Sequence, residues 1–193
     1  MRLNARFAPV CVLLLLIAGQ TVRPVRAEEH VIEAPDDREF VLDFADIVTK
    51  DDTAKISQTG KKLLTDTGVR LVILTVKTMA QYNDADNIQA FSRKVLDHWI
   101  AKQTDKMWTK AVMIVRAKDD KKFRIQLGGA WKHSQDDAVD KIITDIVTPR
   151  FKANEVSKGL LETTNALDKL LRKNISKANV EAEPPPSPPA DKK

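Results

Sequence analysis

The stretch KAVMIVRAKDDKKFRIQLGGAW, residues 110–131, predicts two strands and the turn that follows them. Residues 111–117 are almost continuously apolar, which is typical of a strand covered on both faces. Residues 122–127 alternate between apolar and polar side chains, so we expect this strand to have one solvated face. The polar side consists of Lys122, Arg124 and Gln126. Four polar residues, 118–121, fit a hairpin loop between the two strands.

The turn after this hairpin holds candidates for a ligand site or a functional loop. Gly128 and Gly129 suit a backbone with positive φ, or the close approach of another group. Arg124 could contact a phosphate, although an arginine on a solvated strand face is the alternative. Trp131 could stack on a ligand, or pack at the rim of the core.

The segments before the hairpin predict a strand–helix–strand unit. Thr49 should cap a helix that ends at Gly68. A strand is expected over residues 69–77. Apolar residues then recur at helical spacing from Ile88 to Trp99. This helix connects two strands, so those strands should be parallel with a right-handed crossover.

The segments after the hairpin predict two more helices. Ser134 should cap the third helix and Pro149 should stop it or follow its end. Asn154 should cap the fourth helix. Each helix has one apolar face, which suits packing against a sheet. The expected fold is therefore α/β, a three-layer α/β/α sandwich with a small mixed sheet made of the parallel unit and the antiparallel hairpin strand.

The first 27 residues are expected to be a secretory signal peptide. Arginines precede an apolar run over residues 10–18, and Ala27 offers a small residue for cleavage. Cleavage would leave 28 basic against 27 acidic residues, so the net charge falls from +5 to +1. The charge therefore gives no reason to expect nucleic-acid binding. The mature chain would also lack cysteine, since Cys11 lies in the signal, which excludes disulfides and zinc–thiolate sites.

Composition divides the rest of the chain into three parts. Residues 28–39 form a polar leader, and residues 40–173 form one domain. Residues 174–193 contain the run EPPPSPP and should be a disordered, Pro-rich tail. No transmembrane helix is expected after signal cleavage, and we expect an exported, periplasmic protein if the host is a bacterium with an outer membrane.

Five carboxylates are candidate ligands for calcium or magnesium, which prefer oxygen donors. They are Asp43, Asp46, Asp136, Asp137 and Asp140. Asp43 and Asp46 interrupt an apolar segment, and an aspartate between Leu42 and Phe44 needs some partner. The other three surround the expected start of the third helix. Capping of that helix is the alternative role for Asp136 and Asp137.

An ordered set of weak motifs gives the chain a resemblance to the TPM domain family over residues 38–172. The motifs are VLDFAD with Asp43 and Ala45, Thr67-Gly68, Trp99, Arg124, the glycine turn, Pro149 before Phe151, and Gly159-Leu160. The family includes thylakoid-lumen photosystem II repair proteins, exported bacterial proteins and a nematode receptor auxiliary subunit. The resemblance implies an α/β/α fold, and some members are described as acid phosphatases or as binding calcium. Gly128-Gly129-Ala130 departs from the Gly-x-Gly usual in the family.

Two classes of function follow from the residues and the resemblance. One is a non-catalytic, divalent-cation-binding interaction or maintenance module of the cell envelope, with a membrane or envelope protein complex as partner. The other is a metal-assisted acid phosphatase, in which the metal polarises the phosphoryl oxygen of a phosphomonoester. The sequence contains no P-loop and no recognised phosphatase nucleophile motif. We therefore favour the interaction module, and whether the protein is an enzyme stays open.

Overall fold

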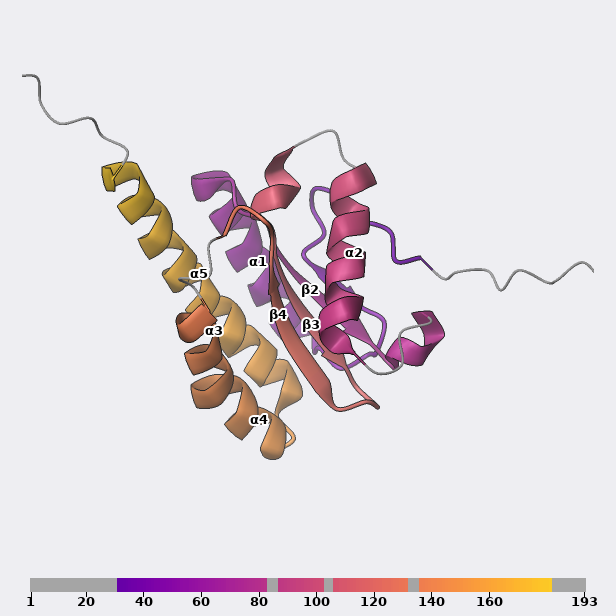
Figure 1. The fold of residues 1–193 in the computed structure, drawn as a ribbon. Helices are drawn as coiled ribbons and strands as arrows, with labels where there is room; N and C mark the ends of the chain where they lie inside the picture. The colour runs from indigo at the N-terminus through magenta and orange to yellow at the C-terminus, as the bar shows by residue number, and fades with distance from the viewer. Residues whose placement is uncertain (1–30, 83–86, 103–105, 132–135, 182–193) are drawn as a thin grey trace, which may run out of the picture.

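A computed structural model describes residues 31–82, 87–102, 106–131 and 136–181 (Figure 1). Its centre is one sheet with the strand order β1-β2-β3-β4. The strands are Val41–Asp43, Leu71–Val76, Val112–Ala117 and Lys122–Leu127. β1, β2 and β3 are parallel, and β4 runs antiparallel to β3. Residues 1–27, predicted to be a signal peptide, lie outside the described residues, as do Ser134 and residues 182–193.

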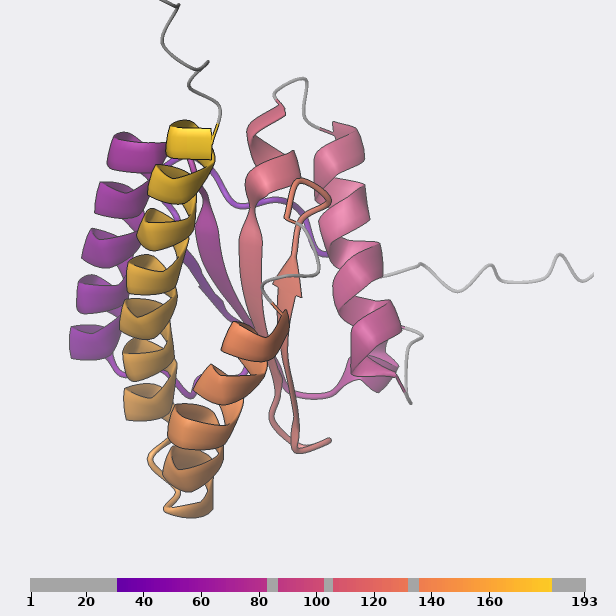
Figure 2. The same cartoon turned by 60° about the vertical axis from the view of Figure 1, so that its left-hand side comes forward.

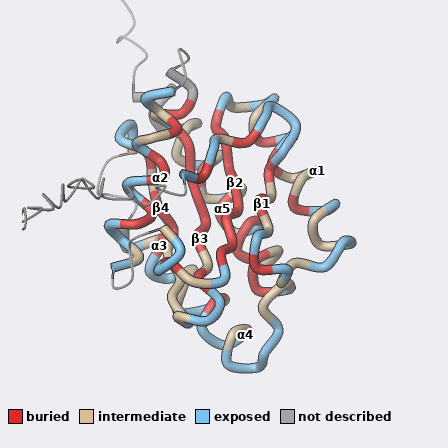
Figure 3. The backbone as a smooth tube through the Cα atoms, turned by 90° about the vertical axis from the view of Figure 1, so that its right-hand side faces the viewer, coloured by how far each residue is buried: buried red, intermediate tan, exposed pale blue. Residues whose placement is uncertain are grey.

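Helices cover both faces of this sheet, which confirms the three-layer α/β/α sandwich (Figure 2). All six residues of β2 are buried, as its apolar sequence predicts (Figure 3). One face is covered by α1 and α5, with α3 beside them, and the other by α2. The helices are α1 (Lys50–Thr67), α2 (Ile88–Lys102), α3 (Asp136–Ile142), α4 (Thr148–Lys152) and α5 (Val156–Glu181). Short 3-10 helices span Met79–Tyr82 and Lys106–Lys110.

The ends of α1 are capped as the sequence predicts, with one addition. The Thr49 hydroxyl accepts a hydrogen bond from the Asp52 amide, and Gly68 closes the helix with φ 70°. In a capping box the side chain at Asp52 would also accept from the Thr49 amide. Here the Ser157 hydroxyl stands between them: it accepts from the Thr49 amide at 2.9 Å and donates to the Asp52 carboxylate. This cap therefore also joins α1 to the start of α5.

The two helical connections between parallel strands have opposite hands. Both step one strand in the same direction along the sheet, yet α1 and α2 pack on opposite faces. The β2–α2–β3 connection is right-handed, as predicted, so β1–α1–β2 is the rare left-handed kind (Figures 1 and 3). Strand twist is what selects the right-handed form, and a strand of three residues accumulates little of it.

The leader packs on the domain through a buried arginine that the sequence analysis overlooked. The Arg70 side chain is fully buried and donates hydrogen bonds to the backbone oxygens of Asp36 and Glu39, the latter at 3.0 Å. Its guanidinium carbon lies 5.3 Å from the ring centre of Phe40 and 5.0 Å from that of Trp108. Burial lowers the pKa of Arg70, and nearby carboxylates oppose that shift.

A second contact fixes the leader closer to its N-terminal end. The indole nitrogen of Trp99 donates to the backbone oxygen of Ile32 at 2.8 Å, and Ile32 is buried. Phe40 then lies directly over Gly60, where an added Cβ would approach the ring to 2.7 Å. Residues 31–40 are thus part of the packed domain, which begins before residue 40.

The polar face of β4 is only partly exposed, which corrects the expectation of a solvated face. Gln126 is buried, and its side-chain oxygen accepts from the hydroxyl of Ser92 on α2 at 3.2 Å. Its amide nitrogen donates to the Leu127 backbone oxygen at 2.9 Å. A polar residue can occupy a buried position when its hydrogen bonds are satisfied there, and alternation alone does not reveal that.

Pro149 does not end the third helix as expected. α3 continues through a π-helical turn, Ile143–Val147, into α4, with Pro149 in the first turn of α4. In the turn the Thr148 amide bonds to the Ile143 oxygen five residues back. A proline lacks the amide hydrogen that a regular α-helix would use at that point, and the π-helical turn changes the hydrogen-bond register just before it.

Asn154 ends α4 and does not cap the next helix, which corrects the prediction for this residue. It has φ 61°, the left-handed conformation common after a helix end. The Asn154 amide bonds to the Phe151 oxygen and the Glu155 amide to the Arg150 oxygen, which is the Schellman pattern. Farther on, α5 extends to Glu181, so residues 174–181, assigned to the tail, are helical.

We expect Arg70→Met to lower the free energy of unfolding by about 2–3 kcal/mol, because two backbone oxygens lose a buried charged donor. Urea unfolding followed by tryptophan fluorescence measures the change. Arg38→Met is the matched control, since Arg38 is an exposed leader residue. Equal stability of the two variants would contradict a structural role for the buried guanidinium.

Candidate functional site

The carboxyl end of β1 holds a turn organised by Asp43. Its carboxylate accepts from the backbone amides of Ile47, at 3.1 Å to one oxygen, and of Val48, at 2.9 Å. It also accepts from the hydroxyl of Thr75, which lies beside it on β2. The partner that the sequence requires for Asp43 is therefore its own turn together with Thr75. These contacts fix the backbone of residues 44–48.

The same turn presents an apolar and an acidic side chain to solvent. Phe44 is 50% exposed, one of two large hydrophobic side chains so exposed in the described part of the chain. Asp46 is exposed and has φ 51°, an uncommon conformation for a residue with a side chain. The Lys118 ammonium, from the β3–β4 hairpin, lies 3.5 Å from the Ala45 backbone oxygen. Ligands of open α/β sheets often bind at this edge.

The Gly128 turn lies at the opposite end of the sheet from Asp43. Asp43 is level with Thr75 and Arg116 in the strand register, whereas Gly128 follows Leu127, which pairs with Val112. The two levels are about 13 Å apart along the strands. Asp137 and Asp140 are exposed on α3, which starts beyond the Gly128 turn, and only the backbone of Asp136 is described.

The five predicted ligands therefore fall into two groups, Asp43 with Asp46 and the three aspartates of α3. Within the described residues, no three His, Cys, Asp or Glu side chains gather closely enough to hold a metal ion. Calcium sites use six to eight oxygen ligands, so backbone oxygens and water would have to supply most of a site at either group.

Gly128 and Gly129 have different environments. A Cβ added at Gly128 would lie 2.4 Å from the Thr109 backbone oxygen, and the Gly128 amide bonds to the Ala111 oxygen at 2.8 Å. Gly129 has open space around it. Neither glycine has positive φ. Of the two reasons for glycine in this turn, close backbone approach therefore applies at Gly128.

The other two loop candidates take part in packing. The Trp131 indole donates to the Lys110 backbone oxygen at 2.8 Å and packs against the α1 and α5 side of the core. Arg124 lies on the α2 side of β4, and its Nε is buried. Arg116, on the other face of the sheet, stacks on Phe151 at 4.8 Å, and burial lowers the pKa of Arg116. A phosphate contact at Arg124 stays a prediction.

Two residues at the carboxyl edge were not singled out from the sequence. Thr75 is the one hydroxyl in LVILTV, and a polar residue inside an apolar strand signals a specific partner. Phe44 stands between two aspartates in DFAD, and charged residues on both sides of an aromatic one argue against a core position for it. Both signals depend on knowing that Val41–Asp43 is a strand.

Comparisons with known proteins identify relatives of the fold. A family model described as TPM domain matches residues 41–170. The N-terminal domain of a P. gingivalis protein, solved by NMR, is 18% identical with TM-score 0.60, over 73% of this chain and 87% of that one. The N-terminal domain of a Corynebacterium glutamicum protein is 11% identical with TM-score 0.53, over 72% and 84%. A search of the curated proteins finds no match.

No helix within the described residues combines the length and apolar character needed to cross a membrane.

We expect Gly128→Ala to lower the free energy of unfolding by about 1–3 kcal/mol, because the methyl group must displace the Thr109 backbone. Gly129→Ala should change it by less than about 0.5 kcal/mol. Chemical denaturation of both variants beside the wild type tests the pair. A larger loss of unfolding free energy at Gly129 than at Gly128 would show that the turn requires glycine at the second position and not at the first.

Proposed function

This chain belongs to the TPM domain family, and on that premise we propose that it is a non-catalytic, divalent-cation-binding interaction module of the cell envelope. The observation that carries the proposal is the turn at the end of β1. Asp43 uses its carboxylate to fix this turn, which leaves Phe44 and Asp46 facing solvent. A rigid backbone that exposes an aromatic and an acidic side chain suits binding to a partner.

The contacts of Asp43 also argue against a catalytic role for that carboxylate. Both of its oxygens already accept hydrogen bonds from the fold, from two backbone amides and the Thr75 hydroxyl. A nucleophile or general base needs a lone pair free to meet the substrate. The same edge of the sheet offers Lys118 in contact with a backbone oxygen of the turn. This arrangement favours binding over hydrolysis.

Cation binding in this proposal centres on Asp46. This exposed carboxylate and the backbone oxygens of its turn are hard donors of the kind that calcium prefers. One free carboxylate implies a weak site, in the millimolar range of extracellular modules.

The location and partner in the proposal rest on the start of the sequence. The charged, then apolar, first 27 residues support export, and we propose the periplasm as the destination in a host with an outer membrane. A partner there would be a membrane or envelope protein complex. Phe44 would supply the apolar anchor of that contact, because aromatic residues are enriched among residues that dominate interface energies.

Calorimetry of the chain without residues 1–27 tests the cation site. We expect calcium to bind in the millimolar range, and Asp46→Asn to weaken binding about tenfold through loss of a charged ligand. The double variant Asp137→Asn, Asp140→Asn is the control, since these aspartates lie on α3 and form no cluster of potential ligands with the β1 turn within the described residues. Absence of binding at millimolar calcium and magnesium would refute this part.

Hydrolysis assays decide between the module and a phosphatase. A phosphomonoester is incubated across acidic to neutral pH, with and without calcium, beside the double variant Asp43→Asn, Asp136→Asn. We expect no activity that the variant abolishes. Substantial hydrolysis that disappears in a variant still shown to be folded would establish the metal-assisted acid phosphatase instead.

Affinity capture from a detergent extract of the host envelope tests the interaction surface. We expect a defined set of proteins on the wild-type chain and its loss with Phe44→Ser, because the variant removes the exposed aromatic group without touching the core. Val31→Ser is the matched control, since Val31 is similarly exposed, at 47%, in the leader. Equal capture by both variants and the wild type would place the contact elsewhere.

A further inference from the structure

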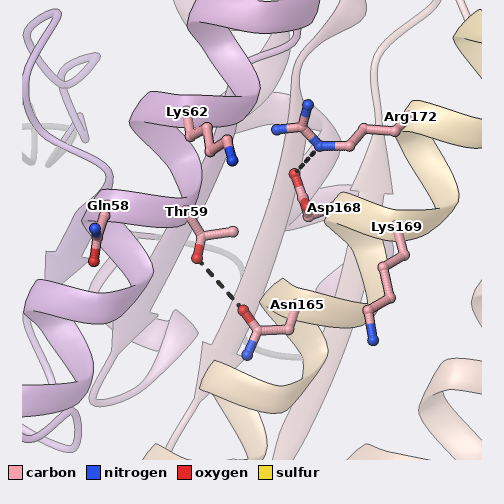
Figure 4. A pocket seen from close by; sticks show the side chains of 7 residues that line it. All are labelled: Gln58, Thr59, Lys62, Asn165, Asp168, Lys169 and Arg172. Carbon is pink, nitrogen blue, oxygen red and sulfur yellow. Dashed lines mark hydrogen bonds and ion pairs between the residues drawn. The ribbon is translucent and has the colours of Figure 1, made fainter.

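A polar groove lies between α1 and α5, on a part of the surface that the proposed function does not use (Figure 4). The two helices run in the same direction, since Thr49 meets Ser157 and Asp66 meets Arg172. The groove has a volume of about 410 Å³. Its lining is polar or charged throughout: Gln58, Thr59, Lys62, Asn165, Asp168, Lys169 and Arg172.

Two sets of contacts between the helices shape the groove. The Thr59 hydroxyl lies 3.4 Å from the side-chain oxygen of Asn165, which joins the walls along one side. Arg172 forms ion pairs at 2.8 Å with both Asp66 on α1 and Asp168 on α5. The guanidinium is therefore held in place, and the only carboxylate in the lining is already paired with it.

The remaining charge of the groove is positive and uncompensated. Lys62 and Lys169 form no ion pair or hydrogen bond with any residue that the structure describes. Figure 4 shows Lys62 and Arg172 reaching toward each other from α1 and α5. With Asp66, which pairs with Arg172 from beside the groove, three cationic side chains stand against two anionic ones, and the two lysines carry the charge that is not paired.

We propose that this groove binds a phosphate group, with Lys62 and Lys169 as its principal cationic contacts. Lysine binds phosphate as a mobile point charge, and a fixed arginine adds directed donors. Thr59 and Asn165 supply neutral hydrogen-bonding groups at the same place. The lining has no apolar side chain, so it suits a phosphate or a phosphate-bearing head group and gives no seat to an acyl chain.

The site is independent of the turn at β1. It lies along the outer surface of α1 and α5, whereas Asp43 and Phe44 lie at the carboxyl end of β1. Phosphate could arrive as a soluble ion or ester, or as the head group of an anionic lipid. The chemistry of recognition is the same in both cases, and the test has an arm for each source.

The experiment uses the chain without residues 1–27 and two matched double variants. Lys62→Gln, Lys169→Gln removes the groove charges, and Lys61→Gln, Lys173→Gln removes equal charge from exposed positions on the same helices. In one arm, NMR follows backbone amides during titration with inorganic phosphate at constant low ionic strength. In the other, the proteins sediment with phosphatidylcholine vesicles that contain or lack phosphatidylglycerol.

We expect phosphate to shift the amides of residues 58–62 and 165–172, with affinity about tenfold lower in the groove variant than in the control variant. Lysine-dependent sedimentation with the anionic vesicles would identify a lipid head group as the source. Shifts in the first arm alone would identify soluble phosphate. Absence of binding in both arms, or equal binding by the two double variants, would overturn the proposal.

Discussion

The sheet of this domain is stable only if both of its faces are covered. Every residue of β2 is buried, and so is every residue of β3 except Arg116. Apolar side chains therefore project from both faces of the sheet. Two separate apolar clusters result, one under α1 and α5 and one under α2. The second would be incomplete without the leader, whose Ile32 joins it and whose backbone is tied to Arg70 and Trp99. Because both faces of the sheet must be covered, the polar N-terminal segment is part of the fold.

Most of the fold could be predicted because its strands and helices carry strong local patterns. The apolar run of β2, the alternation of β4 and the capping residues of α1 each act within a few residues. β1 could not be predicted, because three residues are too few for a pattern and its hydrogen bonds come from β2. The predictions for Pro149 and Asn154 were wrong for a related reason, because they relied on the usual local roles of these residues. The π-helical turn carries α3 into α4 just before Pro149. The Schellman pattern then makes Asn154 the end of α4 and not the start of α5.

The candidate site was only partly predictable. Asp43 stood out correctly as a residue that needs partners, and the structure provides them in its own turn and in Thr75. Its grouping with the aspartates of α3 depended on where the glycine turn lies. β4 is antiparallel to its neighbour, so Gly128 comes after the amino ends of the parallel strands while Asp43 lies at their carboxyl ends. Proximity of this kind follows from strand direction, which periodicity does not give.

The pairing of α1 with α5 has a consequence for the order in which the chain folds. Contacts between these helices join residues 105 to 108 positions apart in the sequence, as in Asp52 with Ser157 and Thr49 with Ser157. Such distant contacts form slowly, since a long loop must close first. The packing of α1 against α5 can therefore be completed only after almost the whole domain has been synthesised, so the last helix closes the structure that the first one begins.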